Sequence, residues 1–146
     1  MKKYCLGFAF DNSLSNVLLI EKQTPEWQKG LLNGVGGKLE DFDLSFKHAM
    51  TREFLEEVNI NTTLDDWQYF AKMQGNNFEV EIFYSKLSDF SSLKQNTHEK
   101  PLFMGINQLF NKKFDNCINN LIWLVPMAMD ASKTKIQSNI NYNFNT

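Results

Sequence analysis

Three glutamates lie within one turn of a predicted helix, in the segment Arg52-Glu53-Phe54-Leu55-Glu56-Glu57. Because a helix advances about 100° per residue, Glu53, Glu56 and Glu57 share one face within an arc of about 100°. Like charges this close destabilise an isolated helix by roughly a few tenths of a kcal/mol per pair. A hard divalent cation, which prefers oxygen ligands, would offset that repulsion. The ordinary alternative is a solvated acidic helix face.

A glycine-rich stretch, Gly34-Val35-Gly36-Gly37-Lys38-Leu39-Glu40, precedes this helix. Glycine lets the backbone approach a ligand closely. A glycine run alone also describes an ordinary turn. Followed at this distance by a helix that carries carboxylates, it favours a site for a metal-bound phosphate chain.

Together, residues 37–60 resemble the Nudix box, which combines a glycine, a glutamate and the run Arg-Glu-apolar-any-Glu-Glu-any-Gly-apolar. The residues that fit it directly are Gly37, Arg52, Glu53, Phe54, Glu56, Glu57 and Ile60. There are three departures. Asp43 stands where the first box glutamate would be, and the loop from Asp43 to Arg52 has one extra residue. Asn59 replaces the last glycine, although Asn tolerates the left-handed conformation that ends a helix.

The resemblance implies an α+β fold, the Nudix α/β/α sandwich with a mixed central sheet and two main helices. It implies a hydrolase that cleaves a nucleoside diphosphate linked to another group, by attack of water on phosphorus. Such enzymes use Mg²⁺, or Mn²⁺ in its place. The expected metal ligands are a Gly37 or Lys38 carbonyl and the carboxylates of Glu53, Glu56, Glu57 and Glu99.

The expected catalytic residues are Glu53, Arg52 and Glu99. By resemblance, Glu53 joins the metal or orients the water, and Glu99 binds metal or acts as general base. Arg52 would orient the glutamates by bidentate hydrogen bonds. The alternatives are that Glu53 only pairs with Arg52 or Lys38, that Glu99 is an exposed loop residue, and that Arg52 forms a surface ion pair.

Two segments bear on the substrate. The run from Asn33 to Lys38 resembles the loop of oxidised-purine nucleoside triphosphatases in this family, where the asparagine contacts the base. In the same proteins two aspartates precede a tryptophan, as Asn119 and Asn120 precede Trp123 here. An amide pair can read a purine edge while an aromatic ring stacks on the base.

Cys117 stands where the stacking ring is expected, so Trp27 or Phe114 would replace it, whereas Trp123 is expected in the core. The predicted substrate-binding residues are therefore Asn33, Lys38, Trp27, Asn119 and Asn120.

The expected function is hydrolysis of a nucleoside triphosphate, such as the oxidised purine nucleotide 8-oxo-dGTP, to the monophosphate and pyrophosphate. One alternative substrate is ADP-ribose or another nucleoside diphosphate-linked compound. A non-catalytic nucleotide-binding module is the other alternative. Such modules usually lose the box glutamates, and all three are present here.

Composition narrows the class of protein. A chain of 146 residues is expected to form one domain, and we assign residues 1–146 to it. A net charge of −2 gives no electrostatic basis for binding long nucleic acid. No apolar run reaches the roughly 20 residues of a membrane span. Cys5 and Cys117 are expected to be reduced and buried, as in a cytoplasmic monomer or homodimer.

Alternating and helical patterns predict the main elements. The predicted strands are Tyr4–Phe10, Val17–Ile20, Val35–Glu40, Trp67–Met73 and Phe78–Leu87, with a polar loop over Ser88–Lys100. The predicted helices are Ser45–Val58 and Asn119–Ala131. Pro126 sits poorly in a helix interior, which favours a later start near Val125. Residues 132–146 form either an edge strand, with Ile140, Tyr142 and Phe144 alternating, or a frayed, disordered tail.

Overall fold

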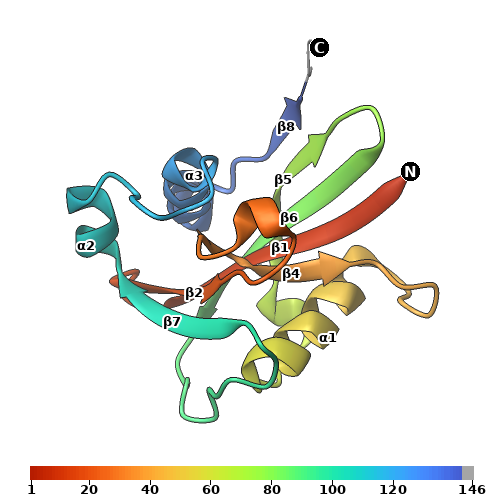
Figure 1. Ribbon diagram of the computed structural model, residues 1–146. Helices are drawn as coiled ribbons and strands as arrows, with labels where there is room; N and C mark the ends of the chain where they lie inside the picture. Colours follow the sequence, from red (N-terminus) through yellow and green to blue (C-terminus); the bar gives the residue numbers. More distant parts are fainter. Residues whose placement is uncertain (143–146) are drawn as a thin grey trace.

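The computed structural model describes residues 1–142, which form one mixed sheet with helices on both faces (Figure 1). The strands are β1 (Lys2–Asp11), β2 (Asn16–Glu21), β3 (Leu32–Asn33), β4 (Val35–Lys38), β5 (Gln68–Gln74), β6 (Phe78–Leu87), β7 (Lys100–Gly105) and β8 (Ser138–Asn141). The helices are α1 (Phe46–Val58), α2 (Ile106–Asn111) and α3 (Leu121–Thr134), with short 3-10 turns η1 (Glu26–Gln28) and η2 (Leu64–Asp66).

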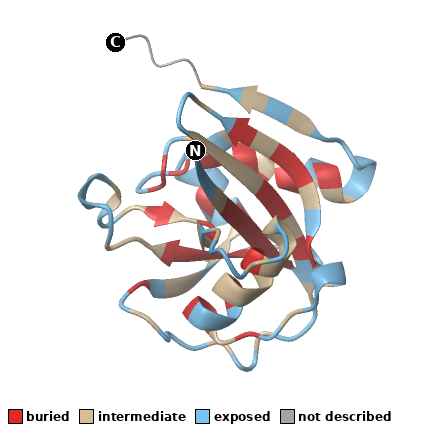
Figure 2. Cartoon of the chain, turned by 90° about the vertical axis from the view of Figure 1, so that its right-hand side faces the viewer, coloured by how far each residue is buried: buried red, intermediate tan, exposed pale blue. Residues whose placement is uncertain are grey.

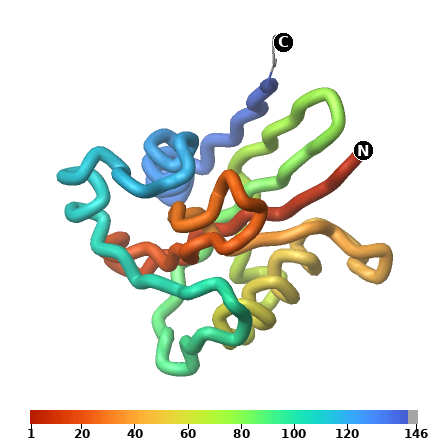
Figure 3. The backbone as a smooth tube through the Cα atoms, in the orientation of Figure 1, coloured from red at the N-terminus to blue at the C-terminus, as the bar shows by residue number. Residues whose placement is uncertain are grey.

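The sheet follows the order β3-β2-β1-β6-β5-β8, while β4 pairs with β1 and β7 pairs with β2. The β1–β6 and β5–β8 pairs are parallel and the other pairs are antiparallel. The predicted mixed sheet is therefore confirmed, and β1 and β2 pair antiparallel as a hairpin. Figure 3 traces β1 through the middle of the molecule, with the β5–β6 hairpin beside it.

Each face of the sheet carries its own apolar cluster, because residues alternate between the faces of a strand. On one face, Met50, Phe54 and Val58 of α1 are fully buried with Trp67. On the other face, α3 packs its buried residues Leu121, Leu124, Val125, Ala128 and Ala131. Figure 2 shows that burial is concentrated along the central strands. The α/β/α layering expected from the resemblance is confirmed.

Helix α1 begins and ends where the sequence predicts. Ser45 caps its first turn by accepting the His48 backbone N–H at 3.2 Å. Asn59 ends it in the left-handed region with φ 63°, and its N–H donates to the Leu55 carbonyl at 3.0 Å. Asn therefore fills the position that the Nudix box gives to glycine.

One prediction about the second half of the chain needs correction, and two elements there were not predicted. Helix α3 starts at Leu121 and contains Pro126, so the predicted later start near Val125 is wrong. A proline in a helix interior costs about 3 kcal/mol. The burial of the five apolar residues of α3 named above offsets this cost. Strand β7 and helix α2 were not predicted, because Pro101 and Gly105 interrupt the pattern.

The tail takes the edge-strand alternative over residues 138–141. This segment is β8, which pairs in parallel with β5 at the margin of the sheet and places Ile140 beside Met73. Phe144 lies outside the described residues. The two cysteines, Cys5 and Cys117, are free and buried as predicted.

Candidate active site

The glycine-rich strand and the acidic helix meet at Gly37. Strand β4 runs against α1, and a Cβ atom at Gly37 would overlap the Glu53 carboxylate. Only glycine lets the backbone come this close. The fold therefore brings together the two segments that the sequence links to metal and phosphate.

Arg52, the only arginine of the chain, holds the acidic helix to the loop before it. Its Nε and Nη2 donate to the two carboxylate oxygens of Asp43 at 3.0 and 2.7 Å. Its Nη1 donates to Glu53 Oε1 at 3.0 Å and to Glu56 Oε2 at 3.2 Å. Nη2 also donates to the Lys38 carbonyl at 3.2 Å.

The bidentate partner of Arg52 is thus Asp43. The predicted bidentate hydrogen bonds to the glutamates are wrong, because Arg52 donates one hydrogen bond each to Glu53 and Glu56. The Asp43 side chain is only 3% exposed, so Arg52 is more than a surface ion pair. Hydrogen bonds from Arg52 hold the pKa of Asp43 below its usual value. Asp43, the shorter carboxylate that replaces the first box glutamate, therefore helps Arg52 to hold α1 against the glycine-rich strand β4.

Burial and neighbouring negative charge disfavour the ionised form of Glu57. Its side chain is buried at 9% exposure, and its Oε2 atom has no hydrogen-bond partner within residues 1–142. Burial, followed by the charge of Glu53, raises the pKa of Glu57 to about 8, while Lys22 acts in the opposite direction. Burial also raises the pKa of Glu53. An unpaired buried carboxylate oxygen is a position for a cation.

Glu99 lies at 6% exposure, which makes the exposed-loop alternative for this residue wrong. Its Oε1 accepts from Lys22 Nζ at 3.0 Å, and its Oε2 accepts from the Gln23 backbone N–H at 3.0 Å. The charge of Glu99 contributes to the raised pKa of Glu57, so the two carboxylates lie in the same electrostatic environment.

Cationic side chains pair with three of these acids. Within residues 1–142, no three side chains of Asp, Glu, His or Cys are gathered closely enough to hold a metal ion as they stand. Arg52 binds Glu53 and Glu56, and Lys22 binds Glu99. The unpartnered Oε2 of Glu57 and the all-oxygen donor set nevertheless fit a hard cation such as Mg²⁺ or Mn²⁺.

A cavity of about 1140 Å³ adjoins Gly37 on the side of β1 and β4. It is lined by all five residues that the sequence predicts for substrate binding, namely Asn33, Lys38, Trp27, Asn119 and Asn120. The charged side chains that line it, among the described residues, are Lys2, Lys22 and Lys38, with no carboxylate. The cavity therefore offers a neutral hydrogen-bonding surface and positive charge.

Amide groups supply the polar surface of this cavity. Asn33 Oδ1 accepts the Gly34 N–H at 2.8 Å, which leaves the Asn33 amide hydrogens as donors. Asn120 Oδ1 and Gln28 Oε1 are buried acceptors without a partner in the described chain. Gln28 and Lys22 were not predicted from sequence, and within this loop only Trp27 was predicted to line the cavity.

The aromatic residues considered for stacking on a base differ in their exposure. Trp27 lines the cavity and is 70% exposed, so its ring is available for stacking. Phe114 is buried and packs edge-on against Phe110 at 5.3 Å between ring centroids, so its predicted stacking role is wrong. Trp123 packs against the apolar cluster under α3, as predicted.

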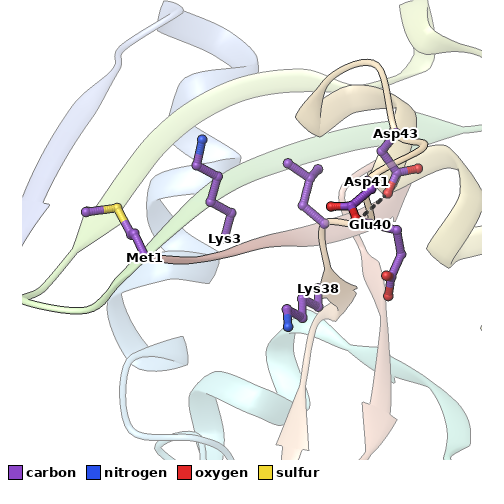
Figure 4. A pocket seen from close by; sticks show the side chains of 7 residues that line it. Met1, Lys3, Lys38, Glu40, Asp41 and Asp43 are labelled. Atoms are coloured by element: carbon purple, nitrogen blue, oxygen red, sulfur yellow. Dashed lines mark hydrogen bonds between the residues drawn. The ribbon is translucent and has the colours of Figure 1, made fainter.

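A second, smaller hollow of about 360 Å³ lies beyond β4 (Figure 4). Lys3, Glu40 and Asp41 line it, and Lys38 lines both this hollow and the larger cavity. The Glu40 N–H donates to Asp43 at 2.8 Å, shown as the dashed line. Glu40 therefore belongs to the loop that supports Arg52.

The sequence matches no family model and gives no significant match to a curated protein. Solved structures are similar, however. The mutator MutT protein from Bacillus halodurans has a TM-score of 0.73 at 16% identity, over 98% of this chain and 91% of that chain. An ADP-ribose pyrophosphatase from Streptococcus suis has a TM-score of 0.69 at 15% identity, over 97% and 98%.

A bifunctional NMN adenylyltransferase/ADP-ribose pyrophosphatase from Francisella tularensis, solved with AMP and a manganese ion, has a TM-score of 0.67. It is 15% identical over 88% of this chain and 41% of that chain. These similarities show that the chain has the Nudix hydrolase fold, which the sequence resemblance predicted. Over residues 1–142, no helix has both the length and the apolar character to cross a membrane.

Proposed function

We propose that this protein is a Mg²⁺-dependent pyrophosphohydrolase that cleaves a nucleoside triphosphate to the monophosphate and pyrophosphate. An oxidised purine nucleotide such as 8-oxo-dGTP is the preferred substrate class. The observation that carries the proposal is the continuity of the site. One cavity holds the amides, Trp27 and the lysines, and it reaches Gly37, whose backbone lies against Glu53.

The part of the cavity that is lined by the amides of Asn33, Asn119 and Asn120 is its neutral end. There the amides would recognise the base. The Asn33 amide hydrogens suit an acceptor on the purine edge, and the unpartnered Asn120 Oδ1 suits a donor. Asn119 lines the same wall, and the exposed Trp27 ring offers a stacking surface. Because a buried acceptor without a partner is unfavourable, a base that supplies its hydrogen bond is favoured over one that does not.

At the charged end, Lys38 and Lys22 would contact the phosphates. Glu56 and Glu57, with Glu53, Glu99 and the Gly37 carbonyl, would hold Mg²⁺, which neutralises phosphate charge and acidifies bound water. Arg52 positions the glutamates through its bonds to Asp43 and the Lys38 carbonyl. Glu53 or Glu99 would orient the attacking water and accept its proton.

A second candidate substrate class is ADP-ribose or another nucleoside diphosphate-linked compound. The cavity of about 1140 Å³ is larger than the roughly 300–1,000 Å³ typical of small-molecule sites. It extends past Tyr4 to Asn77 at the β5–β6 turn, which leaves space for a group beyond one nucleotide. An ADP-ribose pyrophosphatase is among the proteins of similar fold.

The test is a panel of canonical and oxidised nucleoside triphosphates, ADP-ribose, dinucleotides and nucleotide sugars, each with Mg²⁺ and scored by the phosphate species released. Release of pyrophosphate and a monophosphate from a triphosphate supports the first candidate. Two monophosphates from ADP-ribose support the second. Glu57→Gln serves as the inactive control, and a wild-type protein that hydrolyses none of these compounds contradicts the proposal.

A further inference from the structure

Lys22 is held at the boundary between the acidic residues and the cavity. Its N–H donates to the Leu31 carbonyl at 2.9 Å, and its carbonyl accepts from Gly30 at 2.8 Å, so the backbone is fixed on both sides. Its side chain is only 16% exposed and reaches Glu99 Oε1 at 3.0 Å. The same side chain lines the large cavity.

Glu99 is in turn held close to the end of the acidic helix. The loop before it is tied to α1, because the Asn96 N–H donates to the Glu57 carbonyl at 3.3 Å and the Lys94 N–H donates to the Val58 carbonyl at 3.1 Å. These bonds place Glu99, and with it Lys22, beside the end of α1 that carries Glu57.

The two oxygens of Glu99 have different partners. Oε2 accepts the backbone N–H of Gln23, which follows directly on the hydrogen-bonded backbone of Lys22. Oε1 accepts only the flexible Lys22 ammonium group. A cation that approaches Glu57 and Glu99 must therefore compete with Lys22 for Oε1, and the two positive charges repel each other.

We propose that Lys22 is an internal cation that stands in for the divalent metal at Glu99 and turns to the substrate phosphates when the metal binds. The inference rests on the proposed function, because it assumes a metal at Glu57 and phosphates in the cavity. Lys22 is then a positioning residue that couples the two ligands. Metal binding releases its ammonium group, and a phosphate in the cavity accepts it, so each ligand strengthens the binding of the other.

The first experiment measures Mn²⁺ affinity by calorimetry on the full chain, with and without an unreactive imido analogue of a purine nucleoside triphosphate. Removal of the competing charge in Lys22→Met should tighten Mn²⁺ binding about tenfold in the absence of the analogue. The increase in Mn²⁺ affinity that the analogue gives should be smaller in Lys22→Met than in the wild type, because only the direct attraction between metal and phosphate remains. Lys72→Met is the matched control, since Lys72 pairs with Glu79 at 3.6 Å and neither residue lines the cavity.

The outcomes separate this inference from the proposed function. Unchanged Mn²⁺ affinity in Lys22→Met, with hydrolysis by the wild type, overturns the role of Lys22 alone. A wild type that takes up no Mn²⁺ under either condition overturns both. If Lys72→Met changes the affinity as much as Lys22→Met does, the effect is one of net charge and the inference is wrong.

A second measurement uses the wild-type protein and does not depend on the folding of Lys22→Met. The ammonium resonance of Lys22 is followed by NMR on protein labelled with ¹⁵N-lysine, and it is assigned by its absence in Lys22→Arg. Addition of Mg²⁺ should shift this resonance, and the nucleotide analogue should shift it again. A Lys22 resonance that neither addition changes contradicts the proposed movement.

Discussion

The candidate site has an acidic end, at the glutamates of α1 and Glu99, and a neutral end, at the amides that line the large cavity. At the acidic end, Glu53, Glu56 and Glu99 each pair with a cationic side chain, and Glu57 is buried with one oxygen unpaired. At the other end, the lining amides are neutral, and Asn120 and Gln28 keep buried acceptors unpaired. Charge is therefore concentrated where a phosphate would react, and neutral hydrogen bonds where a base would be read.

This difference has a consequence for pH. Amide groups do not titrate, so recognition at Asn33, Asn119 and Asn120 is expected to be the same across the neutral range. The acidic end changes its charge in that range, because burial raises the pKa of Glu57 to about 8. Base selection and turnover should thus respond differently to pH and to mutation.

The largest expected effect comes from the acidic end. Glu57→Gln removes the charge of a buried carboxylate whose Oε2 has no hydrogen-bond partner among residues 1–142, so on the proposed function turnover should fall by roughly three orders of magnitude. The fold should be retained, because Gln has nearly the same shape. The measurement is kcat at saturating Mg²⁺, with Glu79→Gln as the control. Activity close to wild type in Glu57→Gln would remove this residue from the site.

The second effect is on the stability of the metal-free protein. The pKa of Glu57 is about 8 in the folded chain, whereas that of an unperturbed glutamate is 4.5, so the folded chain holds this proton more tightly. The contribution of Glu57 to stability is therefore greatest below about pH 4.5, and it is lost as the pH rises through about 8.

Glu57→Gln cannot ionise and should escape this loss. Between pH 5 and pH 8 it should gain on the order of 3 kcal/mol relative to the wild type. The check is urea unfolding of both proteins in a chelator. Parallel pH profiles for the two proteins would show that Glu57 does not bear this charge.

The third effect tests the link between the acidic helix and the loop before it. Arg52→Lys cannot donate two parallel hydrogen bonds to Asp43, so the glutamates lose their fixed orientation. We expect a decrease of roughly 10- to 100-fold in kcat and in Mn²⁺ affinity. If both constants stay at their wild-type values, Arg52 serves only the stability of the fold.

The smallest effect is expected at the neutral end. Asn33→Ala removes amide donors that line the cavity, and it should change the ranking of purine bases by about tenfold in kcat/KM. Pyrophosphate release from the best substrate should change less. Equal weakening of every substrate would mean that Asn33 only supports Gly34, whose N–H it accepts.

Local signals explain what the sequence could predict. The Ser45 cap and the Asn59 C-cap set both ends of α1, and the spacing of Gly37 and Arg52 linked the glycine strand to the helix. The residues proposed for the base, from Asn33 to Asn120, line one cavity although they lie far apart in the chain. Each of these predictions rested on a short stretch of sequence.

The parts that could not be predicted depend on tertiary contacts. Pro126 reads as a helix break, and only the burial of the residues around it lets α3 continue. Pro101 reads as a loop, yet it is tolerated in β7, which pairs with a single strand. Lys22 and Gln28 belong to no motif. Their positions follow from the loop between β2 and β3, which the fold brings to Glu99 and to the cavity.

The most direct test of the account is a calorimetric titration of Mg²⁺ into the wild type and Glu57→Gln, with the unreactive nucleotide analogue, at pH 7 in two buffers of different ionisation enthalpy. The account predicts saturable Mg²⁺ binding by the wild type with release of close to one proton more than in Glu57→Gln, because Glu57 holds a proton at this pH before the metal binds. Glu57→Gln should bind more weakly, and the protons that the analogue's terminal phosphate loses are common to both proteins. A wild type that takes up no Mg²⁺, with or without the analogue, would contradict the central claim.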